Sequence, residues 1–190
     1  MSQLRLVLCR HTEVDLNAEH RYTGQIDVPL NSAGKEQAER LASELSKLKV
    51  SAIYSSDLIR AMQTASEIAI FHPLLSLITD QRLREVNLGQ LNGMLKSEVK
   101  LKYPNQKFST HNPDFDFSDV GGESRTAVIR RYTEFFNELT KNVGTSLDVQ
   151  DNIVVVGHGT ALRIFLESLG IACLLEQGNH QIILYSTKTN

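Results

Sequence analysis

The sequence predicts a three-layer α/β/α fold, with helices on both faces of a mostly parallel central sheet. Short apolar runs alternate with longer segments of helical period, in the order β-α-β-α-β, an irregular insert, then β-α-β. Residues 153–156 are an unbroken β-branched run of the kind that parallel sheets bury. With 41% hydrophobic residues in a chain of 190, there is enough apolar material for a substantial core.

The first half of the chain divides into segments by hydrophobic period and by turn residues. In order, we expect a strand at 4–8, a polar loop at 13–30, a helix at 32–49, a strand at 52–54, a helix at 55–71 and a strand at 74–79. Asn31 or Ser32 is a suitable N-cap residue for the first helix. The candidate caps of the second helix are Ser55, Ser56 and Asp57.

The second half contains a less regular stretch before the pattern returns. We expect an irregular segment at 83–93, a short helix at 96–103, a long loop at 104–122, a helix at 124–142, a turn at 144–151, a strand at 153–156, a helix ending at 169 and a last strand at 181–185. We interpret residues 1–190 as one domain, in which an insert at about 85–123 forms a lid over the site.

Composition excludes several classes of function. The net charge of −2 and the lack of a basic stripe argue against a nucleic-acid partner. No apolar run approaches the length that spans a membrane, and the N-terminus does not resemble a signal peptide. Cys9 and Cys173 are interpreted as buried thiols in a reducing compartment. We therefore expect a cytoplasmic protein without a membrane partner, either a monomer or a homodimer.

Three expected strands end in residues suited to binding an anion. The first ends in Arg10 and His11, the second leads into a helix whose first turn holds Arg60, and residues 153–156 lead into His158 at another helix N-terminus. Ligands bind at the carboxyl ends of parallel strands, and helix N-termini favour negative charge. These groups, with Glu85 as the obvious acid, predict a phosphate pocket. Singly, each residue also suits an ordinary structural role, so the interpretation depends on the whole set.

Five ordered motifs give the chain a family resemblance over nearly its whole length. They are R-H-T-E-V-D-L-N at 10–17, R-Y-T-G-Q-I-D-V-P-L at 21–30, S-S-D-L-I-R-A-M-Q-T-A at 55–65, L-R-E-V-N-L-G-Q-L-N-G at 83–93 and V-V-V-G-H-G-T-A-L-R at 154–163. With these motifs the chain resembles the histidine phosphatase superfamily, also called phosphoglycerate-mutase-like. Among short members it is most similar to the α-ribazole and broad-specificity phosphatases.

The resemblance implies a role for each matching residue. His11 is the nucleophile that becomes phosphohistidine, and Glu85 is the proton donor to the leaving alkoxide. The phosphoryl oxygens are held by Arg10, Arg60 and His158, and the remaining substrate-binding positions are Asn17, Thr23, Gly24, Gly159 and Thr160. The resemblance implies a small-molecule phosphate ester as the partner, no cofactor and no metal.

Elementary electrostatics is consistent with these roles. Cationic donors around a phosphate monoester remove the repulsion that an approaching nucleophile meets, and they match the charge of the transition state. His11 attacks while neutral, and nearby arginines disfavour its protonated form. We expect its other ring nitrogen to donate to a carbonyl, which selects the tautomer.

The chain departs from the family pattern at a few positions. Thr12 stands where the family usually has glycine, which narrows that turn, and Leu16 and Gln25 replace aromatic residues. In the expected long loop, we hypothesise that three aromatic residues stack on a ring or an apolar leaving group: Phe108, Phe115 and Phe117.

Three other functions are considered. A phosphoglycerate mutase shares this chemistry, but mutases of the family are longer and carry an arginine pair in the insert, whereas no arginine lies between Arg84 and Arg125 here. A catalytically inactive module that binds phosphorylated ligands is disfavoured because the reactive set is intact. A metal hydrolase is disfavoured because the arginines repel a cation and no H-E-x-x-H spacing occurs.

Overall fold

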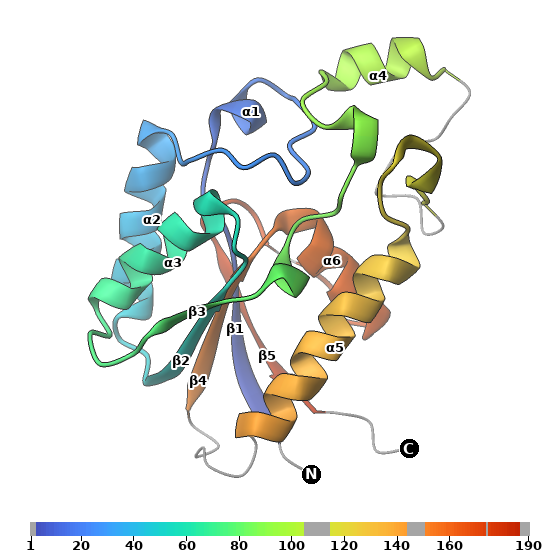
Figure 1. The fold of residues 1–190 in the computed structure, drawn as a ribbon. Helices are drawn as coiled ribbons and strands as arrows, with labels where there is room; N and C mark the ends of the chain where they lie inside the picture. The colour runs from blue at the N-terminus through green and yellow to red at the C-terminus, as the bar shows by residue number, and fades with distance from the viewer. Residues whose placement is uncertain (1–2, 105–114, 144–150, 174, 187–190) are drawn as a thin grey trace.

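The computed structural model describes residues 3–104, 115–143, 151–173 and 175–186, and within them a five-stranded sheet has the order β3-β2-β4-β1-β5 (Figure 1). The strands are β1 (Leu4–Arg10), β2 (Val50–Ser55), β3 (Leu77–Thr79), β4 (Asn152–Gly157) and β5 (His180–Tyr185). The first four run parallel, and β5 pairs antiparallel with β1. The mostly parallel sheet expected from the sequence is confirmed.

Helices cover both faces of this sheet, as the three-layer prediction requires. The helices of the described residues are α1 (Asp15–Ala18), α2 (Ser32–Leu45), α3 (Ile59–Ile70), α4 (Lys96–Lys102), α5 (Arg125–Val143) and α6 (Gly159–Ser168), with short 3-10 turns at Gln81–Leu83, Gly89–Leu91 and Ser118–Val120. Figure 1 shows α2 and α3 on one side of the sheet and α5 and α6 on the other. The helix α4 lies beyond the sheet, above the ends of the strands that lead into the site (Figure 1).

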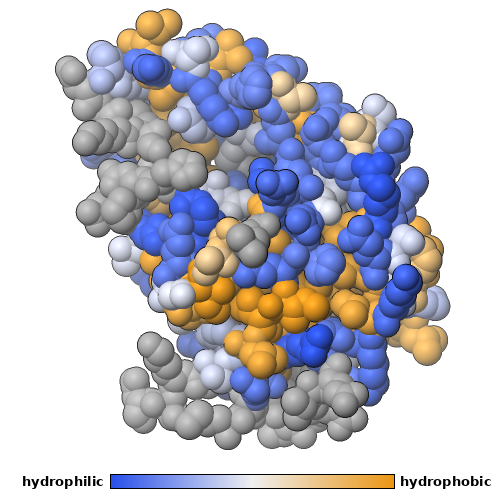
Figure 2. All heavy atoms as spheres, turned by 180° about the vertical axis from the view of Figure 1, so that it is seen from behind, coloured by the Kyte–Doolittle hydropathy of each residue, from blue (hydrophilic) through white to orange (hydrophobic). Residues whose placement is uncertain are grey.

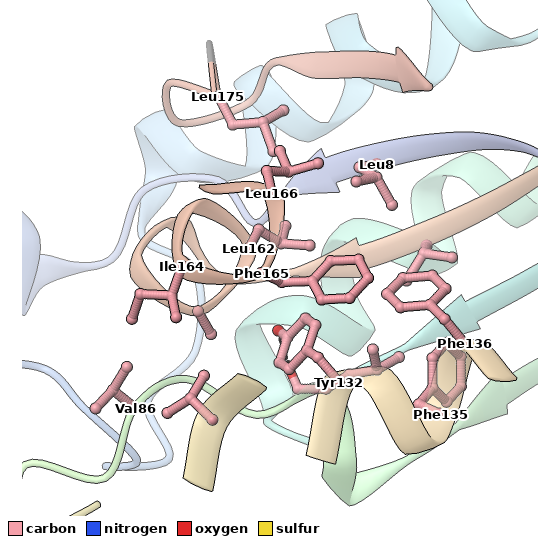
Figure 3. Close-up of a cluster of buried hydrophobic side chains, with 14 of the residues drawn as sticks. Leu8, Val86, Tyr132, Phe135, Phe136, Leu162, Ile164, Phe165, Leu166 and Leu175 are labelled. Carbon is pink, nitrogen blue, oxygen red and sulfur yellow. Dashed lines mark hydrogen bonds between the residues drawn. The ribbon is translucent and has the colours of Figure 1, made fainter. Parts of the chain in front are cut away.

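Strand alternation separates the two larger of the three clusters of the core. Val7 faces α2 and α3, whereas the adjacent Leu8 faces α5 and α6, because successive side chains of a strand point to opposite faces. The second cluster is rich in aromatic residues, and Phe136 of α5 stacks on Phe165 of α6 with ring centroids 4.7 Å apart (Figure 3). All six residues of β4 are buried, which explains its continuous apolar run.

The main segment predictions are confirmed, with differences at their ends. Asn31 caps α2, since its side-chain oxygen accepts from the Gly34 amide at 2.8 Å. The cap prediction for α3 is wrong. This helix begins at Ile59, its N-cap Leu58 offers no side-chain acceptor, and the loop residue Asp27 accepts from the Ile59 amide at 2.6 Å. Asp57 instead forms a bidentate pair with Arg84.

Two of the three aromatic residues that we hypothesised to stack on a ligand do not do so. Phe115 and Phe117 are almost fully buried in the core next to α5, so they are not exposed to stack on a ligand. Phe108 lies outside the described residues, as do most of the long loop and most of the turn at 144–151. From the insert, Glu85, Val86, Leu88 and Lys96 line the cavity described below.

Surface features add little to the site itself. Seen from behind, a band of hydrophobic residues crosses the molecule (Figure 2), and the exposed apolar side chains of the edge strand β5 include Ile182 and Leu184.

Cys9 is buried and Cys173 only half-buried, and both are free thiols. Within the described residues, no helix combines the length and apolar character needed to cross a membrane.

Candidate active site

A cavity of about 190 Å³ lies where β1 and β4 end and α3 and α6 begin. Its walls come from segments far apart in the sequence: Arg10, His11, Asn17, Arg21, Tyr22, Thr23, Gly24, Arg60, Glu85, Val86, Leu88, Lys96 and Thr160. The topology explains this meeting, because parallel strands direct their carboxyl ends to one edge of the sheet. All the expected site residues except His158 and Gly159 line this cavity, and those two adjoin it.

His11 is buried directly after β1 and has a defined tautomer. Its Nδ1 lies 2.7 Å from the carbonyl oxygen of Thr12. A carbonyl only accepts, so Nδ1 carries the hydrogen and Nε2 keeps its lone pair. Burial, and then the Arg60 and Arg10 cations, lower the pKa of His11 well below that of an ordinary histidine. The imidazole is therefore neutral at physiological pH, and the lone pair on Nε2 can act as the nucleophile once it is released from the long contact with Arg60.

Arg60 is fully buried in the first turn of α3 and is held by three contacts. Its Nε donates to His11 Nε2 at 3.3 Å, and its two terminal nitrogens donate to the carbonyls of Ile26 and Gly24 at 2.7 Å each. Gly24 has φ +47°, and a β-carbon there would collide with the side chain of Asn92. Burial lowers the pKa of Arg60 to about 10, so it remains a cation at neutral pH.

Arg10 lies against the backbone of Gly159. A β-carbon at Gly159 would stand only 2.7 Å from Arg10 Nε, so glycine is needed for this close approach. Within the described part of the chain, Arg10 Nε is buried without a hydrogen-bond partner. A guanidinium fork with an unfilled donor suits an incoming phosphoryl oxygen.

His158 lies next to His11, with ring centroids 5.0 Å apart. It is fully buried, and neither ring nitrogen has a hydrogen-bond partner among the described residues. Burial lowers the pKa of His158 well below its ordinary value, and Arg60, His11, Arg131 and Arg10 lower it further. A buried polar ring without a partner is uncommon and indicates a place for a ligand atom.

Glu85 occupies the N-terminus of α6 in this structure. Its two carboxylate oxygens accept from the amides of Thr160 at 3.2 Å and Ala161 at 2.9 Å. Thr160 is among the expected substrate-binding residues, but in this structure its amide is bonded to Glu85. The expected acid and the helix N-terminus expected to favour an anion are thus in direct contact, and both Glu85 and Thr160 line the cavity.

The remaining expected substrate residues are hydrogen-bonded to one another or to loops. Asn17 Nδ2 donates to Thr23 Oγ1 at 3.2 Å, and its Oδ1 accepts from Gln177 at 2.7 Å. Both polar ends of Asn17 are therefore engaged while its side chain lines the cavity. The Gln177 contact joins residues 160 positions apart, so local sequence patterns could not have shown it.

Sequence patterns also missed Arg131, which supports the loop that carries Glu85. Its guanidinium donates to the carbonyls of Arg82, Arg84 and Glu85 at 2.6–3.1 Å and pairs with Glu123. One feature of the sequence could have indicated Arg131. It directly precedes Tyr132, which is buried, so this charged residue lies near the core-facing stripe of α5. A half-buried arginine there needs several acceptors, and backbone carbonyls provide them.

A larger cavity of about 700 Å³ lies elsewhere, between α5, the end of α6 and β5. Its lining contains apolar and hydroxyl side chains and the cation Lys141, but no histidine or carboxylate. Volume alone would favour it. The chemistry favours the smaller cavity, because only there do nucleophilic, acidic and cationic groups converge.

Comparisons with known proteins agree with this geometry. The sequence model of the family described as "Histidine phosphatase superfamily (branch 1)" matches residues 6–181 of this chain. "Phosphoglycerate mutase-like protein 4" of Arabidopsis thaliana is 39% identical, over 85% of this chain and 69% of that protein. "Phosphoserine phosphatase 1" of Hydrogenobacter thermophilus is 36% identical, over 88% and 77% of the two chains. A solved mycobacterial glucosyl-3-phosphoglycerate phosphatase in complex with VO3 superposes with a TM-score of 0.78 at 31% identity, covering 87% of this chain and 81% of that one.

Proposed function

This chain belongs to the histidine phosphatase superfamily, and we propose that it is a phosphomonoester hydrolase that works through a phosphohistidine on His11. The observation that carries the proposal is the state of His11. It is neutral, its Nδ1–H is bonded to a carbonyl, and its Nε2 faces a cavity lined by Arg10, Arg60 and Glu85. Nothing else in the described residues combines a nucleophile with two cations and an acid.

In the first step the lone pair of His11 Nε2 attacks phosphorus, and the bond from phosphorus to the ester oxygen breaks. The leaving alkoxide takes a proton from the carboxylic acid of Glu85. The Thr12 carbonyl stabilises the positive charge that grows on Nδ1–H. Arg10, Arg60 and His158 donate to the phosphoryl oxygens, and the Arg60 Nε–H exchanges His11 for one of them.

The second step reverses the proton transfer. Water attacks the phosphorus of phosphohistidine, its proton passes to the Glu85 carboxylate, and the bond from Nε2 to phosphorus breaks. Inorganic phosphate then leaves, His11 is neutral again and Glu85 is protonated for the next cycle. The scheme uses no cofactor and no metal.

The substrate class follows from size and charge. A cavity of about 190 Å³ suits a small phosphorylated metabolite, of the α-ribazole-phosphate type or of broader range. Arg21 and Lys96 add positive charge to the lining, which favours an ester with a second anionic group. Two relatives are named for phosphoserine and glucosyl-3-phosphoglycerate, which both carry a carboxylate.

We propose a cytoplasmic enzyme, consistent with two free cysteines.

A phosphoglycerate mutase is the second candidate, favoured by the names of some relatives. The arginines that flank the insert are engaged elsewhere, since Arg84 pairs with Asp57 and Arg125 pairs with Glu167. A mutase must hold a second anionic group firmly while it keeps its phosphoenzyme from hydrolysing. Among the described residues, the further cations on the cavity wall are Arg21 and Lys96. Arg21 already pairs with Glu19 at 2.7 Å and donates to the Gly93 carbonyl at 2.9 Å, so we favour hydrolysis.

The test is phosphate release from p-nitrophenyl phosphate and from a panel of phosphorylated metabolites that includes phosphoserine, 3-phosphoglycerate and α-ribazole phosphate. We expect His11→Ala to abolish release and to lose the acid-labile phosphoryl label of the wild-type protein. His72→Ala, at a histidine beyond the end of α3, serves as the matched control and is expected to retain activity.

Other outcomes of this test would contradict the proposal. Release that persists in His11→Ala would exclude phosphohistidine chemistry. Interconversion of 3- and 2-phosphoglycerate faster than their hydrolysis would favour the mutase. Binding of the esters without any turnover would favour a ligand-binding module.

A further inference from the structure

Two threonine side chains outside the cavity lining hold the turn that carries His11. Thr12, the residue in place of the family glycine, and Thr64 of α3 are both fully buried. The Thr12 amide lies 3.3 Å from Thr64 Oγ1, and the two hydroxyl oxygens are also 3.3 Å apart. Neither side chain lines the cavity, so neither is a catalytic residue.

The direction of these hydrogen bonds follows from counting protons. Thr64 Oγ1 donates to the Arg60 carbonyl at 2.8 Å, which uses its only hydrogen. Its lone pairs are then free to accept from both the amide and the hydroxyl of Thr12. One hydroxyl on α3 thus receives two bonds from the residue that follows the nucleophile.

The same residue sets the orientation of the nucleophile. The carbonyl of Thr12 accepts from His11 Nδ1, and the amide of the same peptide group, that of Glu13, donates to Gln37 Oε1 at 3.1 Å. The contacts close a ring of four residues: His11 to Thr12, Thr12 to Thr64, Thr64 to the backbone of Arg60, and the Arg60 side chain back to His11 Nε2. Movement at Thr64 would therefore change both the carbonyl on Nδ1 and the cation on Nε2.

We propose that Thr12 and Thr64 are a pair of positioning residues that keep His11 in its Nδ1–H tautomer and aim Nε2 into the cavity. Here the Thr12 hydroxyl adds a second bond to Thr64, which the family glycine cannot form. The kinetic side of this inference rests on the proposed function, whereas the tautomer side does not, because it can be measured without substrate.

The test replaces Thr64 by valine, which keeps the shape and removes the hydroxyl. We expect kcat for phosphate release to fall about 10- to 100-fold, because small displacements of a reacting group cost that much, with KM changed less than about threefold. Long-range ¹H–¹⁵N spectra should show His11 changing from one tautomer to a mixture. Thr64→Ser, which retains the hydroxyl, should restore most of kcat and the single tautomer.

Thr140→Val is the matched control. Thr140 is also a buried helical threonine, and its hydroxyl donates to the carbonyl four residues earlier, that of Phe136, at the same 2.8 Å. It lies in α5, away from the cavity lining, so it should lower stability like Thr64→Val while leaving kcat and the tautomer unchanged. If Thr64→Val and Thr140→Val were alike in both readouts, the proposal would be overturned.

A double-mutant cycle tests whether the two threonines act together. Thr12→Gly combined with Thr64→Val should be no slower than Thr64→Val alone, because both changes remove one shared contact. Multiplicative effects would contradict the pairing. Should wild-type protein prove inactive on every ester, the proposed function fails, while the His11 spectra of the same variants still decide the positioning proposal.

Discussion

His158 shows how strongly burial shapes the chemistry of a single residue. Its ring is fully buried beside His11 and two guanidiniums, and burial lowers its pKa. In the described structure its ring nitrogens have no hydrogen-bond partner, which is unfavourable for a buried polar group. A hydrogen bond from the ring to a phosphoryl oxygen would offset this cost. A neutral donor at this place stabilises an anion without competing with His11 for a proton.

Glu85 is the residue whose two tasks oppose each other. As a carboxylate it accepts from Thr160 and Ala161, so it occupies the helix end where a phosphate would bind. Glu85→Gln removes both the negative charge and the transferable proton. We predict that kcat falls at least about 100-fold, while inorganic phosphate, measured as a competitive inhibitor, binds more tightly.

The matched control for this change is Glu98→Gln. Glu98 is also a carboxylate that accepts from an amide at a helix N-terminus, that of Leu95 at 2.8 Å, but it is exposed and does not line the cavity. It should leave both kcat and phosphate inhibition unchanged. Weaker phosphate binding by Glu85→Gln would show that this carboxylate does not compete with the ligand.

Gly159 is predicted to tolerate no side chain. In Gly159→Ala the new β-carbon would force the Arg10 guanidinium out of place, since it would lie 2.7 Å from Nε. We expect KM for p-nitrophenyl phosphate to rise at least about tenfold, with a melting temperature near that of wild type. Gly157→Ala, where the nearest side-chain atoms are 3.3 Å away, should have the smaller kinetic effect. Equal effects would contradict the role given to the Arg10 contact.

At the scale of elements, α3 depends on a loop for its start. Because Leu58 cannot cap the helix, Asp27 does so from the segment that also supplies the Gly24 and Ile26 carbonyls to Arg60. The loop and the helix therefore position Arg60 together. Neither would do so alone, since the carbonyls belong to one and the guanidinium to the other.

We predict that Asp27→Ala lowers the free energy of unfolding by about 1 kcal/mol, as loss of an N-cap does, and also raises KM because Arg60 loses its fixed position. Asn31→Ala removes the cap of α2 and should cost a similar amount of stability without a change in KM. Denaturant unfolding and steady-state kinetics on both variants check this. The element-level account fails if KM responds equally to the two changes.

The acid loop depends in the same way on α5. Arg131 donates to three backbone carbonyls of that loop, and Gln25 donates to the carbonyl of Glu85 at 2.9 Å. The Tyr132 hydroxyl adds a bond to the Leu83 carbonyl at 2.9 Å. A segment without regular structure is thereby fixed by several hydrogen bonds, as the proton-donor role proposed for Glu85 requires.

For the whole molecule, the two buried histidines make stability depend on pH. The pKa of each is lowered in the native state, by burial first, whereas in the unfolded chain each takes up a proton near its ordinary value of about 6.5. The unfolded state then binds more protons, so stability falls as the pH is lowered through 6.5 towards the depressed native values.

We predict a loss of up to about 1.4 kcal/mol per pH unit for each of the two histidines below about pH 6, measured by denaturant unfolding between pH 7 and pH 5. His158→Gln should roughly halve this slope, whatever its effect on stability at pH 7. A slope that His158→Gln leaves unchanged would mean that this ring is not buried in its neutral form.

Hydrophobic periodicity and turn residues were enough to predict most of the helices and strands of this protein. The short apolar run at 4–8, the β-branched run at 153–156 and the stripes of α3 and α5 predicted the layers correctly, because the pattern of apolar residues along a segment shows which of its faces is buried. Strand ends and family motifs were enough to bring His11, Arg60 and His158 to one edge of the sheet. The order in which the strands pair, with β1 between β4 and β5, needed the structure.

Tertiary structure alone decided the contacts between distant segments. The cap of α3 by Asp27, the support of Glu85 by Arg131, the burial of Phe115 and Phe117, and the bonds of Thr12 to Thr64 all join residues with no shared local pattern. The physical reason is that a donor can bond to any acceptor within hydrogen-bond distance. The packing of the helices on the sheet decides which acceptors lie at that distance. The sequence by itself determined which groups meet at the site, and packing determined how each is held.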